Sequence, residues 1–394
     1  MLRVITRLNV GGPSIQAVRL TTGLGACGFE TLLLHGSVGS AEGDMSYLLP
    51  AGGAPGTNVV NVRRIAALRR SIAPWSDVRA LMAIARAMAE FRPDIVHTHM
   101  AKAGLLARTA AVLYNWTHPS RRARIVHTYH GHVLEGYFAG PVTQLFIGLE
   151  RLLSRFTDRI VAVSPIVRDD LLTRYRIGSA DTFVVIPLGL ELDAFAAIDA
   201  AARTAARLAL EIPAGAAVVT TVGRLTAIKN HTLFLHMAQR LPAATKDIVF
   251  LIAGDGELRA ELERDANARG LAGRVRFLGW RRDLETIYGA TDVFAITSAN
   301  EGTPVALIEA MAAGVAGVST DVGGVRDVIT DPSLGVVVPP GNAEALASAV
   351  EELLADAGRR ERIGEAARQS AMERFRFERL TADIARMYRE LVPT

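Results

Sequence analysis

The chain of 394 residues has a single cysteine, few aromatic residues and no long uncharged apolar run. With only Cys27 present, an intrachain disulfide is excluded, and a reducing, cytoplasmic compartment is predicted. No apolar segment reaches the length of a membrane-spanning helix, and the first residues lack the apolar core and cleavage site of a signal peptide. The sequence therefore predicts a soluble protein, or one bound to the surface of a membrane.

Several ligand-binding motifs are also missing. Neither a GxGxxG motif directly after a predicted strand nor a Walker A loop is present, which argues against a dehydrogenase and a P-loop ATPase. Asp-x-Asp, with which many metal-dependent sugar transferases hold a divalent ion on a diphosphate, is absent. Histidines gather at the ends of two predicted strands without cysteine or carboxylate at ligand spacing, so no metal is expected. These histidines are His97, His99, His127, His130 and His132.

Positive charge is concentrated in one half of the chain. Residues 1–188 hold 21 Lys and Arg against 12 Asp and Glu, whereas residues 189–394 hold 23 against 28. A basic half suggests a nucleic acid, a membrane surface or a lipid phosphate as partner, or only a solvated arginine-rich face. Nucleic acid is disfavoured, because the arginines are not accompanied by the pattern of aromatic and basic residues that stacks on bases.

Short β-branched runs alternate with helical patterns along the whole chain, which predicts two doubly wound α/β domains. The expected first domain covers residues 1–188 and the second covers 189–376, with the alanine-rich segment 189–213 as linker. An amphipathic helix at 377–394 is expected to pack back on the first domain. Ligands bind beyond the carboxyl ends of such strands, so we expect a deep cleft between the two domains.

The most informative segment is 301–309, which begins and ends with glutamate. Glu301 precedes a helix predicted at 305–313, and Glu309 lies inside that helix. Pro304 suits the first helical turn and Thr303 suits the N-cap position. The N–H groups from Gly302 onward would then face an anion at the positive end of the helix, which suggests a phosphate-bearing ligand. Two glutamates at this spacing also occur by chance in helical proteins.

Candidate ligand-binding residues follow the first strand of each predicted domain: two cations in the second domain and two glycines in the first. Arg224 and Lys229 come directly after the strand at 218–223. The forked guanidinium of Arg224 and the compact ammonium of Lys229 would suit a diphosphate there. An ordinary solvated loop would have the same spacing. Gly11 and Gly12 follow the first strand of the chain and would let backbone N–H groups approach a phosphate or sugar, or only form a tight turn.

Together these segments resemble the retaining glycosyltransferases of family 4. Segment 301–309 is similar to the E-x7-E motif of that family, and Arg224, Lys229, the glycine pair and segment 127–131 stand where the family carries its site. The resemblance covers nearly the whole chain. Segments 42–45 and 96–104 are similar to the branch that acts in bacterial polysaccharide and cell-envelope assembly.

The resemblance implies a GT-B fold and a metal-independent hexosyltransferase without cofactor, with the nucleotide sugar held by the second domain. The catalytic residues that the resemblance implies are His130, Glu301, Arg224 and Lys229. Arg224 and Lys229 would neutralise the diphosphate, Glu309 would bind the ribose, and Glu301 would face the sugar hydroxyls. His130 would contact the sugar near its C6 hydroxyl, and no protein nucleophile is implied. The other donor-binding positions are Gly11, Gly12, Gly302, Thr303, Pro304 and, around the base, Gly254, Gly279, Trp280 and Arg281.

The expected donor is a UDP sugar, with GDP-mannose as the alternative. The expected acceptor is a saccharide or a lipid-linked sugar, held by the basic domain at the inner face of the cell membrane. Segment 63–70 is expected to form a membrane-surface helix, and segment 136–149 to meet lipid or to pack in the core. Two alternatives are a nonhydrolysing UDP-N-acetylglucosamine 2-epimerase and a silent protein that only binds a nucleotide sugar.

Overall fold

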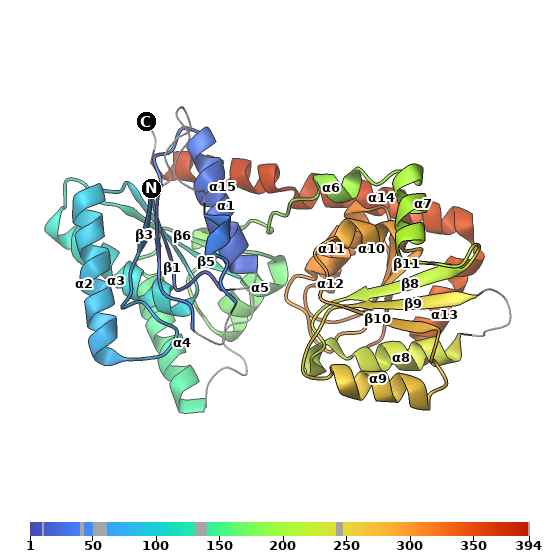
Figure 1. The fold of residues 1–394 in the computed structure, drawn as a ribbon. Helices are drawn as coiled ribbons and strands as arrows, with labels where there is room; N and C mark the ends of the chain where they lie inside the picture. Colours follow the sequence, from blue (N-terminus) through green and yellow to red (C-terminus); the bar gives the residue numbers. More distant parts are fainter. Residues whose placement is uncertain (10–11, 40–42, 50–60, 131–139, 242–246, 393–394) are drawn as a thin grey trace. The chain divides into compact units, whose positions relative to one another are not determined.

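The structure, a computed structural model, describes residues 1–9, 12–39, 43–49, 61–130, 140–241 and 247–392. It divides the chain into two compact units (Figure 1). Unit 1 contains Met1–Gly189 and Phe377–Thr394, and unit 2 contains Leu190–Arg376. Among the described residues, no helix has both the length and the apolar character that crossing a membrane requires.

Unit 1 is built on a parallel sheet with the strand order β3-β2-β1-β4-β5-β6-β7. The order reverses between β1 and β4, which makes the carboxyl ends of these two strands a topological switch point. Both strands are fully buried, as expected for central strands covered on two faces. The strands are β1 (Leu2–Ile5), β2 (Leu32–His35), β3 (Asn61–Arg64), β4 (Ile95–His99), β5 (Arg124–Tyr129), β6 (Arg159–Ala162) and β7 (Phe183–Val185).

The helices of unit 1 pack on this sheet through apolar residues at helical spacing. In α2, for example, the buried face consists of Ala80, Ile84, Ala87 and Met88. The helices are α1 (Gly12–Ala26), α2 (Pro74–Phe91), α3 (Ala101–Thr117), α4 (Gly140–Ser154), α5 (Pro165–Asp169) and α15 (Phe377–Leu391). Three short turns of other helix types are η1 (Ser46–Leu48), η2 (Asp170–Arg174) and η3 (Ala180–Thr182).

The last helix, α15, belongs to unit 1 although the chain reaches it only after unit 2. Its residues Leu380 and Ile384 pack in one apolar cluster with Leu20 and Leu24 of α1. The Tyr388 hydroxyl accepts a hydrogen bond from Arg3 at 3.2 Å and lies 2.5 Å from Nδ1 of His97. These contacts attach the end of the chain to the two central strands of unit 1.

Unit 2 repeats the architecture with a parallel sheet in the order β10-β9-β8-β11-β12-β13, so that its switch point lies between β8 and β11. The strands are β8 (Ala217–Val222), β9 (Ile248–Ala253), β10 (Val275–Gly279), β11 (Val293–Ile296), β12 (Ala316–Thr320) and β13 (Val336–Val338). The helices are α6 (Asp193–Ala196), α7 (Ala200–Ala209), α8 (His231–Arg240), α9 (Arg259–Ala268), α10 (Leu284–Ala290), α11 (Val305–Ala312), α12 (Val325–Val328), α13 (Ala343–Ala355) and α14 (Ala357–Phe375), with a short 3-10 turn η4 (Ala227–Lys229).

The prediction of a linker at 189–213 was wrong, because this segment contains α6 and α7. Its alanines favour a helix, and Ala206 and Leu210 are buried against Val218 and Ile287 of unit 2. The break between the two units falls instead at Gly189 and Leu190.

The prediction of a membrane-surface helix at 63–70 was also wrong. Asn61–Arg64 forms β3, which pairs in parallel with β2, and the chain then turns. Ile65 and Leu68 are buried in the core of unit 1, where a surface helix could not place them. Segment 136–149 lies partly outside the described residues, and its later part is in α4, where Ile147 is buried and Leu145 is exposed.

Candidate functional site

A cluster of charged and hydroxyl side chains lies in unit 2, in the loops after β8 and β11. Lys229 follows β8, and Glu301 follows β11. The Lys229 Nζ atom lies 2.6 Å from Oε1 of Glu301, whose side chain is 7% exposed. Ser298 donates a hydrogen bond from Oγ to the same oxygen, also at 2.6 Å. A buried carboxylate with two donors therefore lies at the switch point of the sheet, where ligands bind in this architecture.

Backbone contacts hold these two loops together. The Thr297 hydroxyl donates to the carbonyl of Lys229 at 3.2 Å, and the N–H group of Ala299 donates to the carbonyl of Ile228 at 2.8 Å. On the other side, the hydroxyl of Thr320 in β12 donates to the carbonyl of Ser298 at 2.8 Å. The position of the Lys229 ammonium relative to the Glu301 carboxylate is thus determined by three neighbouring strands.

A pair of glycines lets the loop after β12 approach this site. A Cβ atom on Gly323 would lie 1.8 Å from the carbonyl oxygen of Glu301, and one on Gly324 would lie 1.9 Å from that of Gly302. The N–H group of Gly324 donates to the Glu301 carbonyl at 3.0 Å. Any side chain at these two positions would displace the backbone that carries Glu301.

The N-terminus of α11 contributes the opposite wall of a small pocket. Lys229, Ser298, Glu301 and the residues from Pro304 to Ala306 line this pocket. The helix begins at Val305 with Pro304 as its N-cap, so the predictions of Thr303 as the cap and Pro304 in the first turn were wrong by one residue. The carbonyl of Pro304 accepts from Leu307 and Ile308, and the N–H groups of the first turn have no acceptor within the helix. The positive end of α11 therefore faces the pocket.

Glu309 lies one turn further along α11 and is mostly buried. The Tyr288 hydroxyl lies 2.9 Å from Oε2 of Glu309 and 3.1 Å from the carbonyl oxygen of Ala306. Burial raises the pKa of Glu309 to about 7; the charge of Glu285 also raises it, whereas the hydrogen bond from Tyr288 opposes the shift. Near neutral pH this carboxyl group is consequently divided between its protonated and charged forms.

The remaining predicted residues of unit 2 follow strands at the same edge of the sheet, and among the described residues none of their side chains forms a hydrogen bond or an ion pair with Glu301. Arg224, five residues before Lys229 in the chain, is exposed, and its guanidinium has no partner among the described residues. Gly254 follows β9 in a left-handed conformation, where a Cβ atom would lie 1.9 Å from the Gly223 carbonyl. After β10, Trp280 is exposed, and Arg281 pairs with Asp283 at 2.5 Å. Gly302 is exposed and Thr303 is partly buried.

The predicted residues of unit 1 form a separate group. Gly12 begins α1 and is exposed, whereas Gly11, Gly131 and His132 lie outside the described residues. His130 Nε2 lies 2.9 Å from Nδ1 of His99, whose ring stacks on that of His97. Burial, together with the charge of Arg3, lowers the pKa of His130 to about 4. His130 is therefore neutral at physiological pH and can donate or accept a hydrogen bond.

Burial likewise holds the pKa of His97, His99 and His127 well below the usual histidine range. Within the described part of the chain, no group of three or more His, Cys, Asp or Glu side chains is placed to hold a metal ion.

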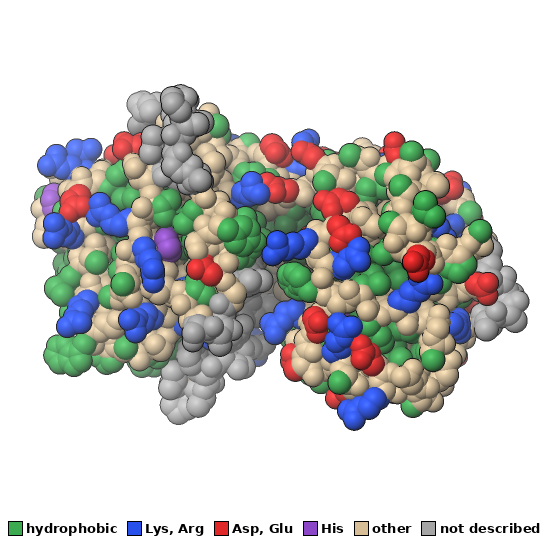
Figure 2. All heavy atoms as spheres, in the orientation of Figure 1, with side chains coloured by type: hydrophobic (Ala, Val, Ile, Leu, Met, Phe, Trp, Pro, Cys, Tyr) green, Lys and Arg blue, Asp and Glu red, His purple; other side chains and the backbone are tan. Residues whose placement is uncertain are grey.

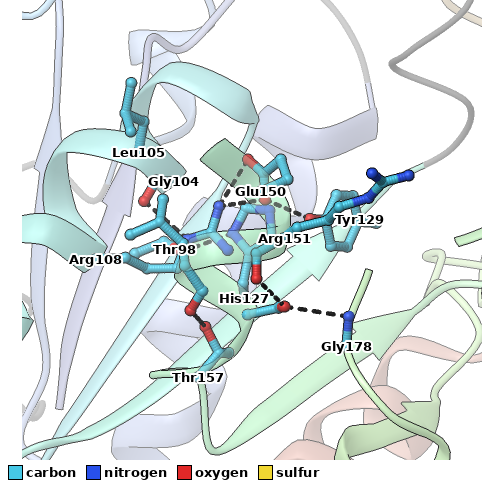
Figure 3. Close-up of polar contacts among 12 residues, drawn as sticks. Thr98, Gly104, Leu105, Arg108, His127, Tyr129, Glu150, Arg151, Thr157 and Gly178 are labelled. Atoms are coloured by element: carbon cyan, nitrogen blue, oxygen red, sulfur yellow. Dashed lines mark hydrogen bonds and ion pairs between the residues drawn. The ribbon is translucent and has the colours of Figure 1, made fainter. Parts of the chain in front are cut away.

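A buried ion pair supports β5, the strand that directly precedes His130 (Figure 3). Arg108 of α3 lies 2.6 Å from Glu150 of α4, with side chains that are 1% and 5% exposed. Tyr129, the last residue of β5, donates to Glu150 at 2.5 Å. Burial and the Glu150 carboxylate raise the pKa of Tyr129 well above its usual range, so the hydroxyl keeps its proton. On the same strand, His127 is hydrogen-bonded to the Thr98 hydroxyl at 2.7 Å.

Sequence reasoning missed three contributors to these sites: Ser298, Tyr288 and the Arg108–Glu150 pair. Ser298 stands three residues before Glu301, a spacing that could have suggested a local hydrogen bond. The other two are joined to their partners only by the tertiary fold, and no local pattern indicates them.

Comparisons with known proteins connect both units to one family. The family model described as Glycosyltransferase Family 4 matches residues 10–194, and the one described as Glycosyl transferases group 1 matches residues 202–370. The chain is 30% identical over 398 residues to a D-inositol 3-phosphate glycosyltransferase of Xylanimonas cellulosilytica, which covers 96% of this chain and 92% of the relative. It is 28% identical over 292 residues, 73% of each chain, to the UDP-Gal:alpha-D-GlcNAc-diphosphoundecaprenol alpha-1,3-galactosyltransferase of Escherichia coli.

Solved structures share the fold. A glycosyltransferase from Rickettsia africae superimposes with a TM-score of 0.81 at 20% identity and covers 100% of this chain and 98% of its own. The complex of Anabaena HepE with UDP has a TM-score of 0.81 at 19% identity and covers 99% of each chain. The predicted α/β fold with two doubly wound domains of the GT-B class is confirmed.

Proposed function

The chain belongs to the glycosyltransferases of family 4, and we propose that it transfers a sugar from a UDP sugar to a saccharide or lipid-linked acceptor with retention of configuration. The Escherichia coli relative takes UDP-Gal and acts on a diphosphoundecaprenol-linked sugar, and HepE was crystallised with UDP, which supports this choice. The observation that carries the proposal is the pocket formed by Lys229, Glu301 and the N-terminus of α11 at the switch point of unit 2.

The leaving nucleoside diphosphate gains negative charge as the bond to the sugar breaks. Lys229 is close enough to contact a phosphate in the pocket, and the exposed Arg224 can supply a second cation with fork geometry. The positive end of α11 adds N–H donors that point at the same place. These charges stabilise the leaving group as it develops, in the role that a divalent ion has in metal-dependent transferases.

Glu301 is suited to bind the sugar of the donor. Lys229 and Ser298 both bond to Oε1, so Oε2 is available to accept a hydrogen bond from a sugar hydroxyl. An ammonium group has three N–H donors, so Lys229 can hold a phosphate oxygen and Glu301 together. Glu301 therefore orients the sugar and keeps Lys229 in place, and it need not attack the anomeric carbon.

Glu309 is suited to bind the ribose. In the free protein its buried carboxylate has Tyr288 as hydrogen-bond donor, and its pKa of about 7 reflects poor solvation of the charged form. Two ribose hydroxyls would supply the missing donors and favour the carboxylate. Trp280, which is exposed, and the partly buried Arg281 follow β10 at the same sheet edge and are suited to contact the base.

The test of this proposal is the turnover of Arg224→Ala and Lys229→Ala with a UDP-sugar donor identified by screening nucleotide sugars in a thermal-shift assay. Removal of one preorganised charge should lower turnover by about 10²–10³-fold. The matched control is Arg240→Ala, which removes an exposed arginine at the end of α8. Turnover near that of the wild type in both Arg224→Ala and Lys229→Ala would contradict the diphosphate site.

A second measurement tests whether the transfer reaction needs a divalent metal ion. If Lys229, Arg224 and the helix end neutralise the leaving group, the transfer rate stays unchanged in excess EDTA after dialysis. A rate that falls in EDTA and returns with Mg²⁺ or Mn²⁺ would show that a divalent ion shares this work.

A further inference from the structure

The start of α2 in unit 1 exposes large apolar side chains that the core does not use. Ile72 is 61% exposed, Trp75 83%, Val78 47% and Met82 58%. Steps of three and four residues put Trp75, Val78 and Met82 on one side of the helix, away from the face that it buries in the core. Ile72 stands two residues before the helix begins. We call Ile72, Trp75, Val78 and Met82 the α2 stripe. In Figure 2, apolar and basic side chains cover the region where Figure 1 shows α2.

Arginines border the α2 stripe. Arg69 and Arg79 are exposed, and neither forms an ion pair among the described residues; Arg69 only donates to the carbonyl of Ala66 at 3.3 Å. The nearest carboxylate in sequence, Asp77, is turned to the protein, where it pairs with Lys102 at 2.5 Å. The border of the stripe therefore carries positive charge that no acid in the described part of the chain neutralises.

The stripe begins at the edge of the sheet where unit 1 would hold a ligand. Lys102, at the start of α3 just beyond the carboxyl end of β4, bonds to Asp77 and to the Ser71 carbonyl. The first turn of α2 is thereby fastened next to the carboxyl ends of the central strands, which form the switch point of unit 1.

We propose that the α2 stripe docks unit 1 on a lipid surface that carries anionic headgroups. Tryptophan concentrates at the boundary between headgroups and acyl chains, and Ile72 and Met82 would enter the apolar layer beside Trp75. Arg69 and Arg79 would meet the headgroup phosphates. A second copy of this chain fits less well, because a symmetric contact through the stripe would bring these arginines against their own counterparts. The proposal rests on the proposed function in one respect: docking is useful because it would bring a lipid-linked acceptor to the sheet edge.

The first experiment is flotation of the full chain with vesicles of phosphatidylcholine, alone or with phosphatidylglycerol. The wild type should float with the anionic vesicles and be released by high salt. Trp75→Ser with Met82→Ser should weaken binding by about tenfold or more, from the lost apolar burial. Arg79→Glu should weaken it by about fivefold or more, from the lost headgroup attraction. The matched control is Trp116→Ser, which removes a tryptophan that is 67% exposed at the end of α3, outside the stripe.

The second experiment uses the small number of tryptophans. The chain has three, Trp75, Trp116 and Trp280, so Trp116→Phe with Trp280→Phe leaves Trp75 as the only reporter. Its fluorescence should shift to the blue when anionic vesicles are added, because the ring leaves water. The variant that retains only Trp116 should show no shift.

Equal flotation of wild type and Trp75→Ser/Met82→Ser, or an unshifted Trp75 spectrum, would overturn the proposal. A dimer in solution that disappears in the same double variant would assign the stripe to a contact between copies instead. UDP binding to each variant is measured in parallel, so a failure of lipid docking is distinguishable from a failure of the donor site.

Discussion

Lys229 and Glu301 are joined by an ion pair of 2.6 Å although 72 residues separate them in the chain. They meet because β8 and β11 are neighbours in the sheet and their loops emerge at the same edge. In the free protein each charge is balanced by the other. A diphosphate that enters the pocket must therefore share Lys229 with Glu301, so the affinity for the donor depends on both residues.

The first prediction concerns the stability that this pair contributes. Lys229→Met leaves the buried Glu301 carboxylate with Ser298 as its remaining side-chain donor, and should lower the free energy of unfolding by about 1–3 kcal/mol. Lys229→Met with Glu301→Gln should be less destabilised than the sum of the two single variants. Urea unfolding of the four proteins measures the coupling. The control is the exposed pair of Arg359 with Glu352, in which Arg359→Met should change the free energy of unfolding by less than about 1 kcal/mol. If the effects of Lys229→Met and Glu301→Gln on that free energy simply add, the two residues are not coupled and the prediction is wrong.

The second prediction makes Ser298 a positioning residue. Without its hydroxyl, the Glu301 carboxylate can rotate about its side-chain bonds, and a hydrogen bond to a charged group contributes about 1.5–3 kcal/mol. Ser298→Ala should therefore lower kcat by about tenfold or more with little change in KM for the donor, and Ser298→Thr should restore most of the rate. Ser319→Ala is the control, because Ser319 is buried in the adjacent strand β12 and its hydroxyl donates to the Thr320 carbonyl. An unaltered kcat in Ser298→Ala would show that Lys229 alone positions Glu301.

The third prediction follows from the pKa of Glu309, which is about 7. If ribose hydroxyls donate to this carboxylate, binding of UDP lowers the pKa, and protons are released at neutral pH. Affinity should then rise as pH increases from 6 to 8, because the free protein gives up a proton in order to bind. Calorimetry of UDP binding at pH 7 in buffers of different ionisation enthalpy measures the released protons.

Two variants provide the controls for that measurement. Glu309→Gln should bind UDP more weakly and abolish the proton release. Tyr288→Phe removes the hydrogen bond that opposes the shift, so it should raise the pKa of Glu309 further and move the pH dependence upward. Identical proton release in the wild type and Glu309→Gln would assign the titrating group elsewhere.

The fourth prediction concerns the buried pair that supports β5. Arg108→Met leaves the Glu150 carboxylate charged and buried, and should lower the free energy of unfolding by about 3–5 kcal/mol. Adding Glu150→Gln removes that charge but keeps an acceptor for Tyr129, so the double variant should regain at least half of the loss. Thermal and urea unfolding compare the three proteins. A double variant less stable than Arg108→Met would mean that the pair contributes more than the relief of an isolated charge.

Much of the fold could be predicted from local patterns. Alternating β-branched runs and helical periods predicted two doubly wound α/β domains, and β3 shows where such patterns fail. Asn61–Arg64 contains one apolar residue, because an edge strand pairs on one side only and is largely exposed. Its arginines resembled the polar face of a helix, and only pairing with β2 made the segment a strand.

Individual residues of the candidate site could be predicted from the sequence, but the contacts between them could not. The sequence by itself determined the two sheets, the cations after β8 and the helix after Glu301, because these depend on periodicity and on local backbone preferences. Only the tertiary structure decided that Lys229 pairs with Glu301, that burial raises the pKa of Glu309 against the hydrogen bond from Tyr288, and that Trp75 faces outward while Leu68 is buried. The physical reason is that charge balance and burial depend on neighbours from distant strands, which no local window of sequence contains.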